Sequence, residues 1–201
     1  MGSADPTPHV GDTPFNAADM QRYFAELDDT LAQEGVDEQL HLFVAGGAVI
    51  ATRTDARLTT DVDVVSDGMT DQLRRCVADV AQRHPGLRTK WLNDDAIVKR
   101  VNLPMEPDRL YEGRTLVIDS AGDRYVLAMK LASGRHIDRP DCELLIRSLG
   151  ITDLGELIYL IQQGVPESRQ HPAMALFAAE RLRDAYPSQS RSPRSGEGLP
   201  L

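Results

Sequence analysis

Residues 42–65 read LFVAGGAVIATRTDARLTTDVDVV, and this stretch decides the fold. The apolar residues at its start predict a strand over 40–45, and the pair Gly46-Gly47 predicts a turn. A helix is expected over 48–55, followed by a second strand over 61–65. This order of strand, glycine turn, helix and strand implies that the two strands share one buried side.

The second predicted strand carries two aspartates two positions apart. Side chains at i and i+2 of a strand point to the same face, so Asp61 and Asp63 project together, away from Val62 and Val64. Adjacent carboxylates repel each other unless a cation or a proton lies between them. Mg²⁺ commonly binds one or two carboxylates and completes its shell with water and substrate phosphates. The pair therefore predicts a site for Mg²⁺ or Mn²⁺.

The glycine turn adds a second signal. Backbone N–H groups at a glycine turn before a helix can approach an anion closely, so a phosphate cradle followed by two carboxylates points to nucleotide chemistry. The alternative is an ordinary turn followed by the solvent face of a half-exposed strand. The functional interpretation is favoured by six residues in order after an apolar run: Gly46, Gly47, Arg57, Thr59, Asp61 and Asp63.

A second motif begins at residue 125 and reads YVLAMKLASGR. Its helix is apolar almost all round except at Lys130, and a lysine in such a helix must extend to solvent or bind an anion. Lys130 is therefore either a snorkelling side chain or a phosphate-binding cation in a cleft. Asp138 and Asp141 fit the N-cap and the first turn of the next helix, and both can also belong to the site.

The two motifs together resemble the nucleotidyltransferase fold of the DNA polymerase beta superfamily. More narrowly, they are similar to the AbiEii-type nucleotidyltransferase toxins and their uncharacterised bacterial relatives. The similarity rests on Gly-Gly followed by Arg-x-Thr-x-Asp-x-Asp, and on a helix with a central lysine followed by an arginine and two aspartates. It covers residues 15–165, and the second motif is the more specific to the subgroup.

This resemblance implies a Mg²⁺-dependent enzyme that transfers a nucleoside monophosphate from an NTP to an RNA, such as tRNA, or to a protein. It also implies a toxin with a cognate antitoxin. By resemblance, the metal is held by Asp61 and Asp63. The triphosphate and the pocket around it are assigned, also by resemblance, to Gly46, Gly47, Arg57, Thr59, Lys130, Arg135 and Asp141.

Two-metal nucleotidyl transfer normally uses a third carboxylate on a later strand. Asp119 is the candidate by position, and Glu112 and Asp108 are weaker ones. Many superfamily members have Gly-Ser where this chain has Gly46-Gly47, and this departure supports an alternative, a catalytically inactive module that binds a partner. A third reading is a kinase-like phosphoryl transferase on the same fold.

Composition limits the class of protein. The chain has 201 residues, of which 41% are hydrophobic and 26% charged, as in ordinary globular proteins. No apolar run approaches the roughly 18 residues of a membrane span, and Cys76 and Cys142 are expected to be free thiols of a cytoplasmic protein. A net charge of −9 disfavours non-specific coating of nucleic acid. A local basic pocket remains compatible with this charge.

The remaining pattern predicts an α+β fold, with a mixed-sheet nucleotidyltransferase core over 15–120 and a helical C-terminal region over 121–186. Residues 1–14 are expected to be a flexible lead and residues 187–201 a disordered tail, because neither has an apolar period. Further strands are expected over 87–92 and 116–119, and helices over 17–34, 71–84, 93–99, 121–133, 139–149, 153–163 and 172–185.

Overall fold

The computed structural model describes residues 12–54 and 57–187, which form an α+β fold around one five-stranded mixed sheet. In chain order its helices and strands are α1 (Ala17–Gln33), β1 (Leu40–Ala45), α2 (Gly47–Arg53), β2 (Val62–Val64), α3 (Asp71–Arg83), β3 (Leu92–Asn93), β4 (Asp108–Glu112), β5 (Leu116–Ser120), α4 (Asp123–Ser133), α5 (Arg139–Ser148), α6 (Leu154–Gly164) and α7 (Pro172–Ala185). Three short 3₁₀ helices are η1 (Ile97–Lys99), η2 (His136–Asp138) and η3 (Glu167–Arg169).

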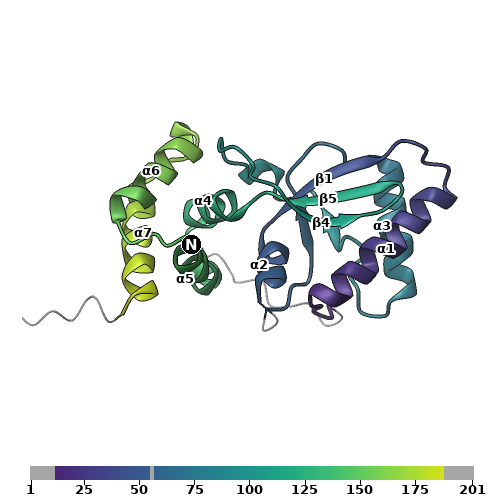
Figure 1. Cartoon of the computed structure of the whole chain (residues 1–201), viewed down its shortest axis with the longest axis horizontal. Coiled ribbons are helices and arrows are strands. Elements are labelled where there is room, and N and C mark those ends of the chain that lie inside the picture. Colours follow the sequence, from purple (N-terminus) through teal and green to yellow (C-terminus); the bar gives the residue numbers. More distant parts are fainter. Residues whose placement is uncertain (1–11, 55–56, 188–201) are drawn as a thin grey trace, which may run out of the picture.

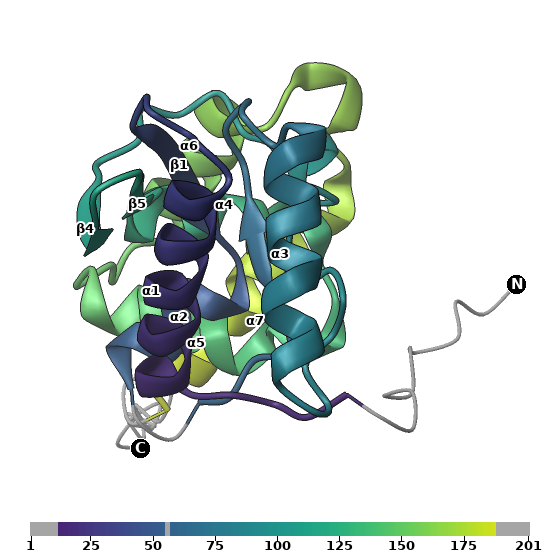
Figure 2. The same ribbon diagram turned by 90° about the vertical axis from the view of Figure 1, so that its right-hand side faces the viewer.

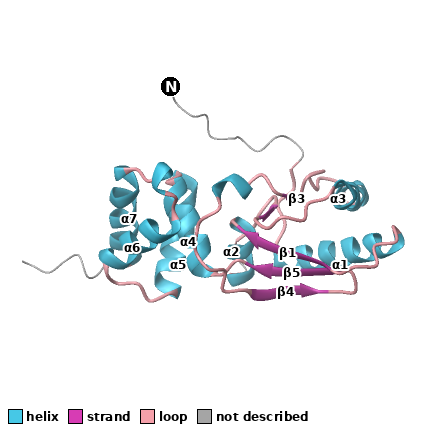
Figure 3. Cartoon of the chain, turned by 90° about the horizontal axis from the view of Figure 1, so that it is seen from above, coloured by secondary structure: helices cyan, strands magenta, loops and turns pink. Residues whose placement is uncertain are grey.

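The strands lie in the order β3-β2-β1-β5-β4 (Figure 3). Strand β1 pairs antiparallel with β2 and parallel with β5, which places Ala45 opposite Asp63 and Phe43 opposite Asp119. Strand β2 pairs parallel with β3, which places Asp63 opposite Asn93. The acidic motif therefore lies beside the strand that leads into the glycine turn, as the sequence predicts.

Helices α1 and α3 lie side by side and pack against the sheet (Figure 2). Helix α1 begins with a capping box, in which the Asn16 side chain accepts from the Asp19 amide and the Asp19 carboxylate accepts from the Asn16 amide. Its apolar stripe, with Leu27 and Leu31, is fully buried together with Leu42 of β1. This layer fixes which face of the sheet is covered.

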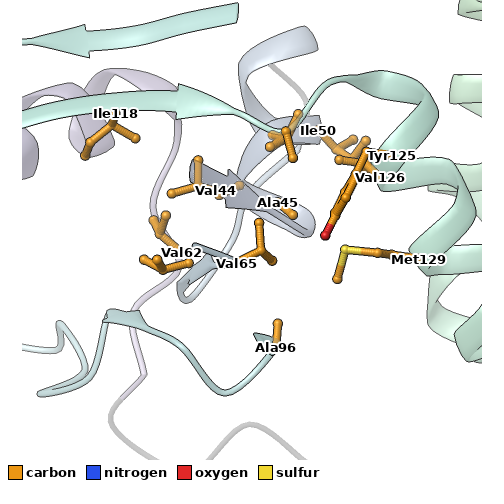
Figure 4. Packing of buried hydrophobic residues seen from close by; sticks show 14 of the residues in the cluster. Val44, Ala45, Ile50, Val62, Val65, Ala96, Ile118, Tyr125, Val126 and Met129 are labelled. Carbon is orange, nitrogen blue, oxygen red and sulfur yellow. The ribbon is translucent and has the colours of Figure 1, made fainter. Parts of the chain in front are cut away.

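Helices α4 to α7 gather at the opposite end of the molecule from α1 and α3 (Figure 1). Helix α4 links the two ends, because Tyr125 and Val126 lie beside Ile50 of α2 and Ala45 of β1 (Figure 4). The buried apolar residues from both ends form one continuous core. The helical C-terminal region is thus packed directly on the sheet region through α4.

The predicted helices agree with the structure except for the one expected over 93–99, where Asn93 belongs to β3 and only the 3₁₀ helix Ile97–Lys99 forms. Two strands also differ. Strand β3 covers only Leu92–Asn93, because the residues before it form turns in which the Leu87 amide donates to His84 and the Trp91 amide to Arg88. Strand β4 was not predicted, since it is an edge strand without a fully buried residue and its sequence DRLYE lacks an apolar alternation.

The expected flexible lead and disordered tail fall mainly on residues 1–11 and 188–201, which lie outside the described residues, as does the expected end of α2 at 55. Residues 12–14 are described, and the Thr13 amide donates to the Gly86 carbonyl at 2.8 Å. Within the described ranges no helix is long and apolar enough to cross a membrane. Both cysteines are buried free thiols, as predicted.

Candidate functional site

A cavity of about 490 Å³ lies between the glycine turn, the start of β2 and helix α4. Its size falls within the range of roughly 300–1,000 Å³ that is typical of small-molecule sites. Eight of the ten residues predicted for the site line it: Gly46, Gly47, Arg57, Thr59, Asp61, Asp63, Lys130 and Arg135. The two motifs, more than sixty residues apart in the chain, thus meet at one cavity.

Steric constraints require glycine at the turn before α2. Gly46 has φ +76°, in the left-handed region that favours glycine, and a Cβ atom there would lie 2.4 Å from Oδ2 of Asp63. At Gly47 a Cβ atom would lie 3.3 Å from the Thr59 hydroxyl oxygen. The missing side chains therefore allow the backbone to approach the acidic strand closely.

Asp63 lies on β2 and Asp61 immediately precedes this strand. Burial, together with the charge of Asp61, raises the pKa of Asp63 to about 6. Burial also raises the pKa of Asp61, against the opposing charge of Arg88. The Arg88 guanidinium lies 3.1 Å from Oδ2 of Asp61 and 3.5 Å from Oδ2 of Asp12. The two partly buried carboxylates thus repel each other, and a bound cation would relieve this repulsion.

These residues fit a divalent cation of the magnesium type. Mg²⁺ needs only one or two protein carboxylates when water and substrate phosphates supply its other ligands, and Asp61 and Asp63 provide two. Over 12–54 and 57–187, no cluster of three or more His, Cys, Asp or Glu side chains is arranged to hold a metal ion by itself. The donor set therefore suits a metal that arrives with a phosphorylated ligand better than a permanently bound structural ion.

Lys130 does not extend to bulk solvent, since it is 5% exposed and lines the cavity. Its Nζ donates to Oδ2 of Asp141 at 2.7 Å and to Oδ1 of Asp138 at 3.0 Å. The charge of a buried lysine needs such partners. Two of the three ammonium donors are therefore engaged within the protein, and the snorkelling alternative is wrong.

Asp138 does not act as the N-cap that the sequence suggested, because no cap hydrogen bond forms from its side chain. Its carboxylate instead accepts from Lys130, from the Ser133 hydroxyl at 2.6 Å and from Nε of Arg135 at 2.8 Å. Burial alone would raise the pKa of Asp138, but Arg135, Lys130 and Ser133 together hold it below its usual value.

Asp141 is absent from the cavity wall, yet it contacts two residues of that wall. Its carboxylate accepts from Lys130 and, at 3.1 Å, from Nη2 of Arg57. Arg57 belongs to the loop before the acidic strand, and Asp141 belongs to α5. This ion pair therefore joins the two sides of the cavity.

Asp119, the candidate third carboxylate, does not line the cavity and is held by two basic side chains. Its Oδ1 accepts from Nε of Arg109 at 2.5 Å, and its Oδ2 lies 2.6 Å from Nε2 of His41. Burial favours a raised pKa at Asp119, but the hydrogen bonds from Arg109 and His41 lower it below the usual value. The weaker candidates are also engaged elsewhere, Glu112 by Arg109 and Asp108 by Arg53.

Two charged residues of the cavity, Asp95 and Lys99, were not assigned to the site from the sequence. Asp95 lines the cavity and its charge raises the pKa of Asp61, while Lys99 lines it and lowers the pKa of Asp63. The Asn93 side chain accepts from the Asp95 amide at 2.9 Å, in the loop that brings Asp95 to the cavity. The sequence signal for Asp95 was the pair Asp94-Asp95 directly after β3, the strand that pairs with β2.

Comparisons of the chain with protein-family models, with curated proteins and with solved structures each found no match.

Proposed function

We propose that the protein is a Mg²⁺- or Mn²⁺-dependent nucleotidyltransferase that moves a nucleoside monophosphate from an NTP to an RNA or protein acceptor. The observation that carries this proposal is the meeting of Asp61, Asp63, a side-chain-free glycine turn and several cations in one cavity. A pair of repelling carboxylates next to cations suits a metal bound together with phosphates. The proposed fold is accordingly a nucleotidyltransferase core with a helical C-terminal half.

The cavity residues have different proposed roles in binding the metal and the triphosphate. A bound metal would be held by Asp61 and Asp63 and would offset negative charge on the reacting phosphates. The backbone at Gly46 and Gly47 leaves room for the triphosphate, and Arg135 and Lys99 place positive charge beside it. Lys130 acts chiefly through Asp138 and Asp141, which it holds by ion pairs. Thr59 shapes the wall, and its hydroxyl donates to the Asp61 carbonyl at 2.8 Å.

A second candidate is a binding module of the same fold without catalytic activity. Two observations favour it: Gly47, not serine, follows Gly46, and Asp119 does not line the cavity. A kinase-like phosphoryl transferase would use the same residues and differ only in the group it moves. The roles of toxin and of antitoxin partner rest on the resemblance alone and belong to this proposal.

The test follows the label from differently labelled NTPs. Incubation with Mg²⁺ or Mn²⁺, total RNA including tRNA, and a protein extract should transfer label from the α-phosphate of an NTP to an acceptor. γ-Labelled NTP should leave the acceptor unlabelled, because nucleotidyl transfer releases pyrophosphate. Ribonuclease and protease treatment of the product separates the RNA acceptor from the protein acceptor.

Two variants and the position of the label distinguish the nucleotidyltransferase from the kinase and from the binding module. Asp63→Asn should lower transfer by roughly 10²-fold or more, because a lost metal ligand removes several kcal/mol of charge stabilisation. Asp119→Asn, outside the cavity, should keep activity and serves as the matched control. Label that comes from the γ-phosphate alone identifies a kinase. Absence of any transfer, with nucleotide binding retained, identifies the binding module.

A further inference from the structure

The segment that precedes helix α1 is attached by its backbone to two loops. The Thr13 amide donates to the Gly86 carbonyl at 2.8 Å, in the turn that follows α3. Two residues later, Phe15 and Thr59 form an isolated β-bridge, with amide-to-carbonyl distances of 2.8 Å and 3.0 Å in the two directions. We call residues 12–15 the N-terminal strap. The strap is therefore fixed both to the turn after α3 and to the loop before β2.

Arg88 lies where these two attachments meet. Its Nη1 donates to Oδ2 of Asp61 at 3.1 Å, and its Nε lies 3.5 Å from Oδ2 of Asp12 in the strap. Asp12 directly precedes Thr13, and the hydrogen bond from Thr13 to Gly86 fixes the strap two residues before Arg88. One guanidinium thus bridges two carboxylates, with a hydrogen bond to Asp61 and a longer contact to Asp12.

Arg88 is the main compensating charge for Asp61. Burial raises the pKa of Asp61, and Arg88 opposes this effect more strongly than Arg135 does. The charges of Asp12 and Asp95 act in the same direction as burial. A divalent ion on the Asp61 carboxylate would repel the guanidinium, whereas Asp12 offers the guanidinium a second partner within reach. The Arg88 side chain is 40% exposed, so a shift toward Asp12 needs no rearrangement of the core.

We propose that Arg88 is a positioning residue for the metal ion: it holds Asp61 until a divalent ion binds there, and it then passes to Asp12. This inference rests on the metal role proposed for Asp61. It extends that role to Asp12 and Arg88, which do not belong to the described wall of the cavity. The transfer preserves charge balance, because Asp12 gains the guanidinium as Asp61 gains the metal. Without Asp12, the guanidinium would stay on Asp61 and compete with the ion.

The test measures Mn²⁺ binding by electron paramagnetic resonance with a non-hydrolysable NTP present. Arg88→Gln should bind Mn²⁺ about fivefold more tightly than the wild type, because a competing cation of a partly exposed ion pair is removed. Asp12→Asn should bind it about fivefold less tightly, because the guanidinium loses its second partner. Arg88→Lys keeps the charge and should bind Mn²⁺ like the wild type.

A double variant separates the transfer of Arg88 from a simple effect of charge, which would give the same two signs. If Arg88 passes to Asp12, then Asp12→Asn should have no effect on Mn²⁺ affinity in the Arg88→Gln background. If the Asp12 charge acts on the ion directly, it should weaken binding there as much as it does in the wild type. Circular dichroism spectra check that all variants are folded.

Arg124 provides a matched control on α4. Its side chain is 38% exposed, close to the 40% of Arg88, and its Nη1 donates to Oε1 of Glu156 at 3.3 Å. Arg124→Gln should leave Mn²⁺ affinity unchanged. Unchanged or weaker binding by Arg88→Gln, or additive effects in the double variant, would overturn the inference.

The same measurements keep this inference apart from the proposed function. If no variant and no wild-type protein binds Mn²⁺, the inference is overturned together with the metal role of Asp61. If the expected pattern of Mn²⁺ affinities appears but no NTP labels an acceptor, the inference stands and the binding module replaces the nucleotidyltransferase. If label transfer occurs but Arg88→Gln binds Mn²⁺ like the wild type, only the role of Arg88 is overturned.

Discussion

Asp63 combines two properties that rarely occur together in a stable fold, partial burial and a carboxylate neighbour of the same charge. Both raise its pKa from the ordinary 3.8 to about 6. Because this pKa lies above that of the unfolded chain, the folded state binds more protons between about pH 4 and pH 6. The contribution of Asp63 to the stability of the wild type should therefore fall as pH rises through this window and then level off.

The first prediction concerns Asp63→Asn. Without metal at pH 7.5, this variant should be more stable than the wild type by about 1–2 kcal/mol, less than the roughly 3 kcal/mol equivalent of the pKa difference because Asp63 is only partly buried. Denaturant unfolding from pH 3.5 to pH 8 measures it. The advantage should vanish near pH 4, and parallel stability curves for the two proteins would contradict the assigned cause.

The second prediction uses two glycines with nearly the same backbone. Gly46 has φ +76° and Gly35 has φ +75°, but a Cβ atom would meet Asp63 at the first and open space at the second. Alanine at either position should cost about 1 kcal/mol of backbone strain. Only Gly46→Ala should also weaken binding of an NTP with Mg²⁺, measured by calorimetry. Equal loss of binding in the two variants would show that strain alone, without the contact to Asp63, is responsible.

At the scale of elements, the helices and the strand-turn-strand unit follow from local pattern. Asn16 caps α1, Thr70 caps α3, and apolar runs place β1 and β5. Strand β4 has no such pattern because an edge strand buries little. Its pairing with β5 places Arg109 opposite Asp119, and the Arg109 guanidinium donates to the Asp119 carboxylate. The ion pair of Asp119 with Arg109 thus depends on an edge strand that the sequence did not predict.

The cavity residues likewise comprise some that the sequence predicts and some that depend on the tertiary fold. The spacing of Asp61 and Asp63 at the start of one strand could be read directly from the sequence. The partners of Lys130 could not, because a loop of the chain folds back to bring Asp138 and Asp141 against it. Lys99 was not predicted as a site residue either. Its position near Asp63 depends on the pairing of β2 with β3, and this pairing spans only two residues of each strand.

The third prediction belongs to helix α4. Lys130→Met should lower the free energy of unfolding by about 3 kcal/mol, since it leaves the buried Asp138 and Asp141 with fewer cationic partners. The same substitution at exposed Lys99 should change stability by less than about 0.5 kcal/mol. Chemical denaturation of both variants makes the comparison. A small effect at position 130 would mean that Arg57 and Arg135 suffice to neutralise the two carboxylates.

At the scale of the whole molecule, one apolar core and the ion pair between Arg57 and Asp141 connect the sheet region to helices α4–α7. The only tryptophan, Trp91, is fully buried near α3, where its indole donates to the Val77 carbonyl at 3.1 Å. Its fluorescence therefore reports on the sheet region, while far-ultraviolet circular dichroism reports mainly on the helices.

The fourth prediction is that these two signals follow a single unfolding transition. Domains of this size with one core usually unfold cooperatively. Thermal and denaturant unfolding curves recorded by both probes should coincide. If the circular dichroism signal were lost before the Trp91 signal, helices α4–α7 would be an independent unit, and the cavity between the two regions would need a ligand to become rigid.

The most direct measurement of the central claim is nucleotide-linked binding of a divalent ion. Mn²⁺, followed by its electron paramagnetic resonance signal, should bind tightly only when a non-hydrolysable NTP is present, because Asp61 and Asp63 supply only part of its shell. Asp61→Asn/Asp63→Asn should abolish this binding, whereas Asp119→Asn should leave it unchanged. Retention of the ion by the double variant, or its loss in Asp119→Asn, would contradict the account.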